Sequence, residues 1–343
     1  MKTILVTGGC GFIGSHTVCE LYKANYDVII VDNFINSNKS VIKSIESIIN
    51  KKLVVYEFDI LDKEKLRKIF NNHNIDGVIH FAALKSVPES IKEPLKYYKN
   101  NITATLILLE VMREYNCKKL IFSSSATVYG NSISPLSEIS NTGIGITNPY
   151  GQTKYMMEKI LEDYSKSNKE INITILRYFN PVGAHSSGLI GENPNNIPSN
   201  LMPYILKVSY QNNKNIFIDK RYKELKIFGN NYQTIDKTCI RDYIHVVDLA
   251  EGHISALNNN KEGLNIYNLG TGKGTSVLEL IKTFEKVNNV KVPYSYSDRR
   301  EGDLEKVYCM AYKAEKELNW KPRLTLEDMC KDAWNYMVKD NKK

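Results

Sequence analysis

The chain has 343 residues, of which 42% are hydrophobic and 24% charged, which argues against disorder and predicts an extended α/β domain with a smaller partner. The formal net charge is +8, yet the lysines are scattered among asparagines and glutamates without forming a basic stripe, so we do not expect nucleic-acid binding. The six cysteines show no CxxC pair and no regular spacing, which predicts reduced thiols and neither a disulfide framework nor a metal site.

The N-terminal residues enter an apolar strand directly, which leaves no room for a signal peptide. No uninterrupted apolar run approaches the length that a membrane span needs. We therefore expect a cytoplasmic protein without a membrane partner.

The first predicted unit is a strand, a glycine turn and a helix. The strand covers Thr3–Thr7, and a helical spacing of apolar residues covers Ser15–Lys23. Between them stand Gly8, Gly11 and Gly14, a Gly-x-x-Gly-x-x-Gly variant of the dinucleotide fingerprint. Glycines let the backbone approach a diphosphate, whose charge then lies at the N-terminus of the helix.

Asp32 ends the next predicted strand, Asp27–Val31. It lies at about the ~20-residue distance at which a carboxylate binds both hydroxyls of an adenosine ribose. Asp32 would repel a 2′-phosphate, and no arginine follows it closely, so the pattern favours NAD over NADP. A purely structural glycine turn is the weaker alternative.

Strands and helices continue to alternate along the chain, which predicts a doubly wound parallel sheet of the Rossmann type. In such a sheet the ligand lies beyond the C-terminal ends of the strands. Single residues at these ends are equally well explained as ordinary loop residues. The further strands are expected at Leu53–Phe58, Gly77–Phe81, Lys119–Ser124 and Ile171–Tyr178.

After Pro181 the composition becomes rich in Gly, Pro, Asn and Ser, which predicts long loops. A second, smaller region of mixed α/β structure is expected to begin here. We predict two domains, 1–180 and 181–343, with segments around 235–260 packing back on the first. The polar stretch 210–226 is expected to be a solvated surface insertion, and its role stays open. This region also contains a predicted helix at Leu249–Leu257, a short strand at Ile266–Leu269 and a helix at Val277–Phe284.

Tyr150 and Lys154 are four residues apart on a predicted helix, so both project from one face. A free tyrosine has a pKa near ~10, and a neighbouring cation is expected to favour its phenolate. The pair is therefore a candidate base with its activating ammonium. Arg299 and Arg300, with Asp303 close behind, either bind phosphate and sugar hydroxyls or pair with one another on the surface.

The order and spacing of these motifs strongly resemble the UDP-glucose 4-epimerase family of extended short-chain dehydrogenases. The resemblance runs from about Lys2 to Trp334. The glycine turn and Tyr-x-x-x-Lys are shared across the superfamily, whereas two longer strings are far more specific. These strings are Ser123-Ser124-Ser125-Ala126-Thr127-Val128-Tyr129-Gly130 and Arg177-Tyr178-Phe179-Asn180-Pro181-Val182-Gly183-Ala184-His185.

The resemblance implies a retained NAD that takes a hydride from C4 of a UDP-sugar and returns it to the opposite face. UDP-glucose and UDP-galactose would interconvert through a 4-keto sugar, as in galactose metabolism. Tyr150 matches the family's base, Lys154 the cation that binds the nicotinamide ribose, and Ser125 the hydroxyl at O4. The family further implies a homodimer.

The resemblance also assigns binding positions. At cofactor positions stand Gly8, Gly11, Phe12, Ile13, Gly14, Asp32, Asn33, Asn36, Ser37, Asp59, Ile60, Phe81, Ala82, Lys85, Asn100, Ser123, Tyr150, Lys154 and Phe179. At UDP-sugar positions stand Lys85, Ser125, Tyr150, Phe179, Asn180, Asn200, Leu201, Phe228, Arg241, Tyr243, Arg300, Asp303 and Val307. The two arginines Arg241 and Arg300 would face the diphosphate.

Two departures from the family pattern matter. Thr238-Cys239-Ile240 precedes Arg241 where the family usually has glycines, which predicts a stiffer loop. Val307 stands where a tyrosine restricts family members to unsubstituted sugars, and its intermediate size predicts some activity on UDP-N-acetylglucosamine.

Dehydratases and decarboxylases of this fold need an extra acid, and Ala126 and Thr127 cannot supply it. An epimerase acting on UDP-glucuronate, or a non-catalytic NAD-binding sensor, stays open from the sequence. Loss of Tyr150 or Lys154 would mark the sensor, and both are present.

Overall fold

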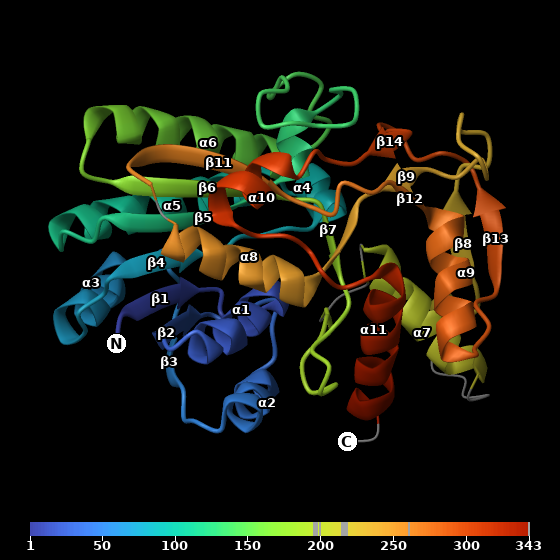
Figure 1. Ribbon diagram of the computed structural model, residues 1–343, viewed down its shortest axis with the longest axis horizontal. Helices are drawn as coiled ribbons and strands as arrows, with labels where there is room; N and C mark the ends of the chain where they lie inside the picture. Colours follow the sequence, from blue (N-terminus) through green and yellow to red (C-terminus); the bar gives the residue numbers. More distant parts are fainter. Residues whose placement is uncertain (195–197, 199, 214–218, 260, 342–343) are drawn as a thin grey trace.

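The computed structural model describes residues 1–194, 198, 200–213, 219–259 and 261–341. Its main layer is a seven-stranded, wholly parallel sheet in the order β11-β6-β5-β4-β1-β2-β3 (Figure 1). The expected doubly wound sheet is therefore confirmed. The strands of this sheet are β1 (Thr3–Thr7), β2 (Asp27–Asp32), β3 (Val54–Glu57), β4 (Gly77–His80), β5 (Lys119–Ser125), β6 (Asn172–Tyr178) and β11 (Gly263–Leu269).

The strand order reverses beside β1. The chain runs outward through β2 and β3, then returns to β4 on the other side of β1 and continues through β5 and β6. The C-terminal ends of β1 and β4 therefore open a crevice, which is where such sheets bind ligands.

Helices cover both faces of the sheet because the apolar strand residues alternate between them. Ile4 and Val6 pack with the face that carries α1, α2 and α8, whereas Leu5 packs with α3, α5 and α6. The helices of these layers are α1 (Phe12–Lys23), α2 (Ser40–Ile49), α3 (Lys63–Asn72), α4 (Val87–Lys92), α5 (Pro94–Glu114), α6 (Pro149–Ser167), α8 (Val246–Asn258) and α10 (Tyr312–Leu318).

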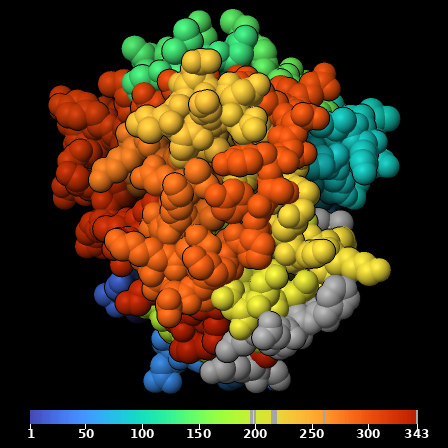
Figure 2. All heavy atoms as spheres, turned by 90° about the vertical axis from the view of Figure 1, so that its right-hand side faces the viewer, coloured from blue at the N-terminus to red at the C-terminus, as the bar shows by residue number. Residues whose placement is uncertain are grey.

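The second region has its own apolar core, in which Ile205, Phe284 and Met329 are buried. Figure 2 views the molecule from this side, where the orange segments beyond residue 270 and the yellow segments before 240 lie together. Its helices and strands are α7 (Leu201–Asn213), α9 (Val277–Asn288), α11 (Leu326–Asp340), β7 (Asn180–Val182), β8 (Leu225–Phe228), β9 (Ile240–Arg241), β10 (Tyr243–His245), β12 (Thr275–Ser276), β13 (Tyr294–Ser297) and β14 (Lys306–Val307), with a short 3-10 turn at η2 (Lys220–Tyr222). Another 3-10 turn, η1 (Ala126–Tyr129), follows β5 of the main sheet.

The chain after residue 181 contributes to both regions. α8 packs against α1, and β11 extends the main sheet by pairing with β6. β11 is also longer than the short strand expected at Ile266–Leu269. The division into 1–180 and 181–343 stays a prediction.

The expectation of a solvated insertion at 210–226 holds only in part for the residues that the structure describes. Lys220, Arg221, Lys223 and Lys226 are exposed, but the apolar residues between them are not. Tyr210, Tyr222 and Leu225 are buried, and Leu225 opens β8. The many polar neighbours hid an apolar face that packs on α7. Residues 214–218 lie outside the described part of the chain.

All six cysteines are buried free thiols, as the sequence predicts. Within the described residues, no helix combines the length and apolar character needed to cross a membrane.

Candidate functional site

The glycine turn brings two stretches of backbone into close contact. Gly8 adopts φ +70°, and a Cβ added there would stand 2.8 Å from the backbone nitrogen of Ala82. At Gly14 an added Cβ would stand only 2.3 Å from the carbonyl oxygen of Gly8. Gly11 precedes α1 without a side-chain cap, so the first backbone N–H groups of this helix remain available to an anion.

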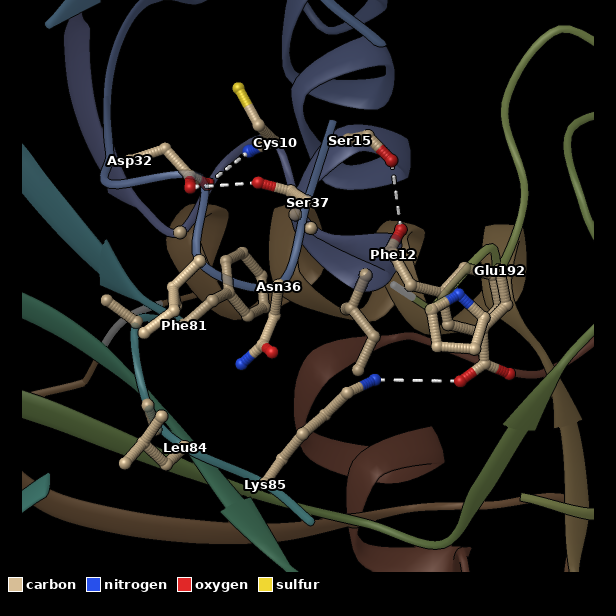
Figure 3. Close-up of a pocket in the computed structure, with 18 of the residues that line it drawn as sticks. Cys10, Phe12, Ser15, Asp32, Asn36, Ser37, Phe81, Leu84, Lys85 and Glu192 are labelled. Atoms are coloured by element: carbon tan, nitrogen blue, oxygen red, sulfur yellow. Dashed lines mark hydrogen bonds and ion pairs between the residues drawn. The ribbon is translucent and has the colours of Figure 1, made fainter. Parts of the chain in front are cut away.

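Asp32 lies at the end of β2 with its carboxylate turned toward the glycine turn (Figure 3). One oxygen accepts from the backbone N–H of Cys10 at 2.9 Å. The other accepts from the N–H of Phe34 at 2.9 Å and from the hydroxyl of Ser37 at 3.0 Å. Nearby, Asn33 donates to Asp59 at 3.0 Å. These bonds hold the carboxylate in place before any ribose reaches it.

A cavity of about 880 Å³ opens beyond these strand ends. Of the residues expected at cofactor positions, only Phe179 does not line it. Phe179 is instead buried with Val128, Tyr129 and Leu136. The cavity walls include Gly8, Gly11, Phe12, Ile13, Gly14, Asp32, Asn33, Asn36, Ser37, Asp59, Ile60, Phe81, Ala82, Lys85, Asn100, Ser123, Tyr150 and Lys154. NAD fits this wall chemically, because a tight glycine cradle and a fixed carboxylate serve its diphosphate and ribose.

Tyr150 and Lys154 project into the cavity from the first turns of α6. Asn148 caps this helix by accepting the N–H of Gly151 at 2.8 Å, and Pro149 occupies its first turn. The ammonium of Lys154 donates to the carbonyl of Ser123 at 2.6 Å and lies 5.1 Å from the centre of the Phe122 ring. The end of β5 thus fixes the lysine.

Ser125 stands at the end of β5 and hydrogen-bonds Tyr150. The Ser125 hydroxyl also accepts the N–H of Thr127 at 3.3 Å, so it caps η1. It is not among the cavity-lining residues. Ser125 therefore reaches the cavity through the phenol of Tyr150.

The electrostatic expectation for Tyr150 is wrong for the protein by itself. Burial raises the pKa of Tyr150, and only the hydrogen bond with Ser125 opposes this. Burial also lowers the pKa of Lys154 to about 7, although the carboxylate of Glu158 raises it in part. The spacing in the sequence predicts a charged ammonium beside the phenol. Burial, however, disfavours both the phenolate of Tyr150 and the ammonium of Lys154.

A buried ion pair beneath Lys154 went unnoticed in the sequence. Arg177 on β6 donates through Nη2 to Glu158 on α6 at 2.7 Å and through Nε at 3.0 Å. Ser124 donates to the same carboxylate at 2.5 Å. The signal was present in principle, because Glu158 follows Lys154 by one helical turn.

A second ion pair crosses the cavity. Lys85, on the loop after β4, lies 3.6 Å from the carboxylate of Glu192 (Figure 3). The same Glu192 carboxylate accepts from Asn200 at 2.8 Å. Lys85 and Asn200 were both expected at ligand positions, whereas nothing in the sequence singled out Glu192.

Most of the residues expected to bind the UDP-sugar lie outside this cavity. Asp303 pairs with Arg241 through one oxygen and with Arg300 through the other, the latter at 3.0 Å. Arg300 also lies 5.0 Å from the centre of the Phe228 ring. Asp303 is therefore paired with Arg241 and Arg300 in the protein alone, whereas Arg299 donates to the side chain of Asn231 at 2.6 Å. Leu201 begins α7 and does not line the cavity.

Four further residues expected to bind the substrate lie in short strands that pair with one another. Asn180 on β7 pairs with Tyr243 on β10, and Val307 on β14 pairs with Arg241 on β9. The Val307 side chain packs against the cluster that contains Phe179. Two small sheets thus pair these four residues, although they are far apart in the sequence.

The profile of the NAD dependent epimerase/dehydratase family matches residues 4–270. The chain belongs to this family. It is 50% identical to the UDP-glucose 4-epimerase of Bacillus subtilis over 336 residues, which cover 97% of this chain and 96% of that protein.

Solved structures of family members agree with the fold. A UDP-glucose 4-epimerase from Bifidobacterium longum in complex with NAD+ and UDP superposes with a TM-score of 0.93, 48% identity and 99% coverage of both chains. Another, from Stenotrophomonas maltophila with bound NAD and formylated UDP-arabinopyranose, gives a TM-score of 0.94 at 43% identity and covers 100% of this chain and 99% of its own.

Proposed function

We propose that this protein is an isomerase that interconverts UDP-glucose and UDP-galactose at C4, with NAD retained between turnovers. The observation that carries the proposal is the convergence of Tyr150 and Lys154 on the cavity whose other end holds the glycine turn and Asp32. One cavity thus combines a proton-transfer pair with a dinucleotide cradle.

The residues that would hold NAD follow from the walls of the cavity. The turn from Gly8 to Gly14 and the N-terminus of α1 would bind the diphosphate, and Asp32 the adenosine ribose. Lys154 would bind the nicotinamide ribose. When bound, NAD accepts a hydride from C4 and returns it, and its oxidised ring adds positive charge near the phenol.

Tyr150 would take the O4 proton as a ketone forms and return it when the opposite face is reduced. Because burial raises the pKa of Tyr150, positive charge entering with the ligands has to favour its phenolate. The Ser125 hydroxyl can both donate and accept, so it suits an O4 that alternates between alcohol and ketone.

The UDP moiety would be held firmly while the sugar turns over, since a released ketone would be lost. Arg241 and Arg300 would take the diphosphate, and Asp303 keeps both arginines in place before UDP arrives. Asn180, Asn200, Leu201, Phe228 and Tyr243 complete the proposed UDP-sugar site.

The experiment compares Tyr150→Phe with the unchanged protein. The variant keeps the ring and its packing, so it is expected to retain NAD while turnover falls by about 10²–10⁴-fold, the usual contribution of a general base. Turnover is followed by the proton NMR signals of the two sugars. A variant that retains wild-type turnover would remove Tyr150 from the role of base.

We further propose that Val307 leaves room for a 2-acetamido group, so that UDP-N-acetylglucosamine is also a substrate. Val307→Tyr is the matched variant, expected to lose the N-acetylated substrate and to keep UDP-glucose. A wild-type rate on UDP-N-acetylglucosamine at background would end this part of the proposal.

The assembly is proposed to be a cytoplasmic homodimer. Leu95 and Leu106 are exposed and eleven residues apart on α5, which places them on one helix face that a second copy could cover. Light scattering on the purified protein, with Leu106→Glu as the disrupting variant, tests the dimer. Cell fractionation tests the compartment, for which the six free thiols argue.

A further inference from the structure

Asp242 lies between two strands that carry proposed UDP-sugar residues. Its chain neighbours are Arg241 at the end of β9 and Tyr243 at the start of β10. Its backbone N–H donates to the carbonyl of Val307 at 3.0 Å, and its carbonyl accepts the N–H of Asn180 at 2.9 Å. The backbone of one residue therefore touches or adjoins four positions assigned to the substrate.

The side chain of Asp242 is wholly buried, and the partners that hold it are all donors. Oδ1 accepts from the N–H and the hydroxyl of Thr271 at 2.8 and 2.6 Å. Oδ2 accepts from the N–H of Gly272 at 3.0 Å, and from the N–H and Sγ of Cys309 at 3.3 Å each. A carboxylate accepts through both oxygens, whereas an amide accepts through only one.

These contacts tie the main sheet to the second region. Thr271 and Gly272 form the turn that follows β11, and Cys309 lies just beyond β14. The packing leaves no free space, because a Cβ added at Gly270 would stand 2.7 Å from Oδ2 of Asp242. The turn after β11 thus holds the side chain of Asp242, while its backbone bonds the strands that carry Asn180 and Val307. This arrangement is called the clamp below.

We propose that Asp242 is a positioning residue that sets the grip on the UDP moiety by fixing Arg241, Asn180 and Val307 relative to one another. It acts through these residues and does not touch the sugar itself. The inference rests on the proposed function of those three residues. Misplacement of a binding group by about 1 Å can cost as much as ~10²-fold, so a clamp of this kind matters for affinity.

The test is Asp242→Asn in the NAD-loaded protein. Either orientation of the amide turns an NH2 group toward N–H donors, of Thr271 in one case and of Gly272 and Cys309 in the other. UDP affinity, measured by calorimetry, is expected to fall at least tenfold, with a matching rise in the KM for UDP-glucose. The kcat and the NAD content are expected to stay within threefold of wild type.

Asp248→Asn is the matched control. Asp248 is equally buried on α8, and one of its oxygens accepts the backbone N–H groups of Arg323 and Leu324 at 3.1 and 2.8 Å. Its side-chain hydrogen bonds go to the segment before α11 and not to the strands proposed to bind UDP. This variant is expected to lower the melting temperature while keeping UDP affinity within threefold.

The outcomes separate the clamp from the proposed function. A wild-type protein that binds no UDP contradicts the proposed function itself. Wild-type binding with an unchanged Asp242→Asn variant, or an equal loss in Asp248→Asn, overturns the positioning role. If Asp242→Asn does not fold, Thr271→Val decides. Loss of the O–H donor to the Asp242 carboxylate should weaken UDP binding about tenfold, and an affinity within threefold of wild type would overturn the inference.

Discussion

Replacing Glu158 by glutamine should affect stability and the pH profile together. Glu158 and Arg177 are buried, with side chains 6% and 4% exposed, and the arginine reaches both carboxylate oxygens. Glutamine leaves the guanidinium charge buried without its counter-ion. Breaking a buried pair in this way costs about 3–5 kcal/mol. A substitution of this size lowers the melting temperature by roughly 2–4 °C per kcal/mol in a domain of 150–250 residues, and by less in a longer chain.

The same substitution removes the carboxylate that raises the pKa of Lys154. That pKa, already lowered to about 7 by burial, should fall further, and the cationic fraction at alkaline pH falls about tenfold for each unit. The loss of kcat on the alkaline side should therefore begin at lower pH in the variant. A structural defect alone would reduce activity without moving the profile.

Glu162→Gln on the same helix is the control, because Glu162 pairs with Lys159 and Lys166 at the exposed surface. Exposed pairs contribute about 0–1 kcal/mol, so this variant should resemble wild type. Thermal unfolding and kcat measured from pH 6 to 10 give both readouts. Equal stability of Glu158→Gln and Glu162→Gln would refute the reasoning about the buried pair, and an unshifted profile would refute its influence on Lys154.

Two further predictions follow from the glycine turn and the buried histidines. Gly14→Ala should abolish NAD retention, because the added Cβ would lie 2.3 Å from the carbonyl oxygen of Gly8, a backbone atom that cannot move without distorting the turn. The measurement is the amount of cofactor released on denaturation, read from its absorbance at 260 nm. An amount equal to that from wild type would contradict the prediction. Burial lowers the pKa of His16 and His80 to about 3 and that of His253 to about 4, so these rings stay neutral when folded while the unfolded chain binds protons below its pKa of about 6.5. Stability from these groups is thus present above pH 6.5 and lost toward pH 4, by up to about 1.4 kcal/mol per pH unit for each ring. Urea unfolding at pH 7 and pH 5 that gave equal free energies would speak against it.

Local patterns in the sequence were enough to predict the main sheet. The strand Thr3–Thr7 agrees residue for residue with β1, because a β-rich apolar run ends sharply at a glycine turn. The helix after Pro149 also forms as expected, since Asn148 and Pro149 are strong start signals.

Contacts between distant segments could not be predicted. Glu158 meets Arg177, and Asp242 meets Thr271, through the packing of separate strands and helices. Helical spacing places Glu158 next to Lys154, but no local pattern marks Arg177 or Thr271 as a partner. For the same reason β11 was expected as a short strand in the second region, although it pairs with β6 in the main sheet.

The spacing of two residues in the sequence also does not predict their charge in the folded protein. Tyr150 and Lys154 are neighbours on α6 as expected, but the sequence cannot show how far burial shifts the pKa of each. Phe179 adjoins Asn180 in sequence, yet its side chain is buried in the core with Tyr129, which no local pattern marks.

The retained-cofactor mechanism is tested most directly by adding UDP-galactose to the purified protein without NAD. UDP-glucose is expected to form over many turnovers, and the amount of bound NAD is expected to be unchanged at the end. Formation of product only when NAD is added in stoichiometric amounts, or no product from protein that carries NAD, would contradict it.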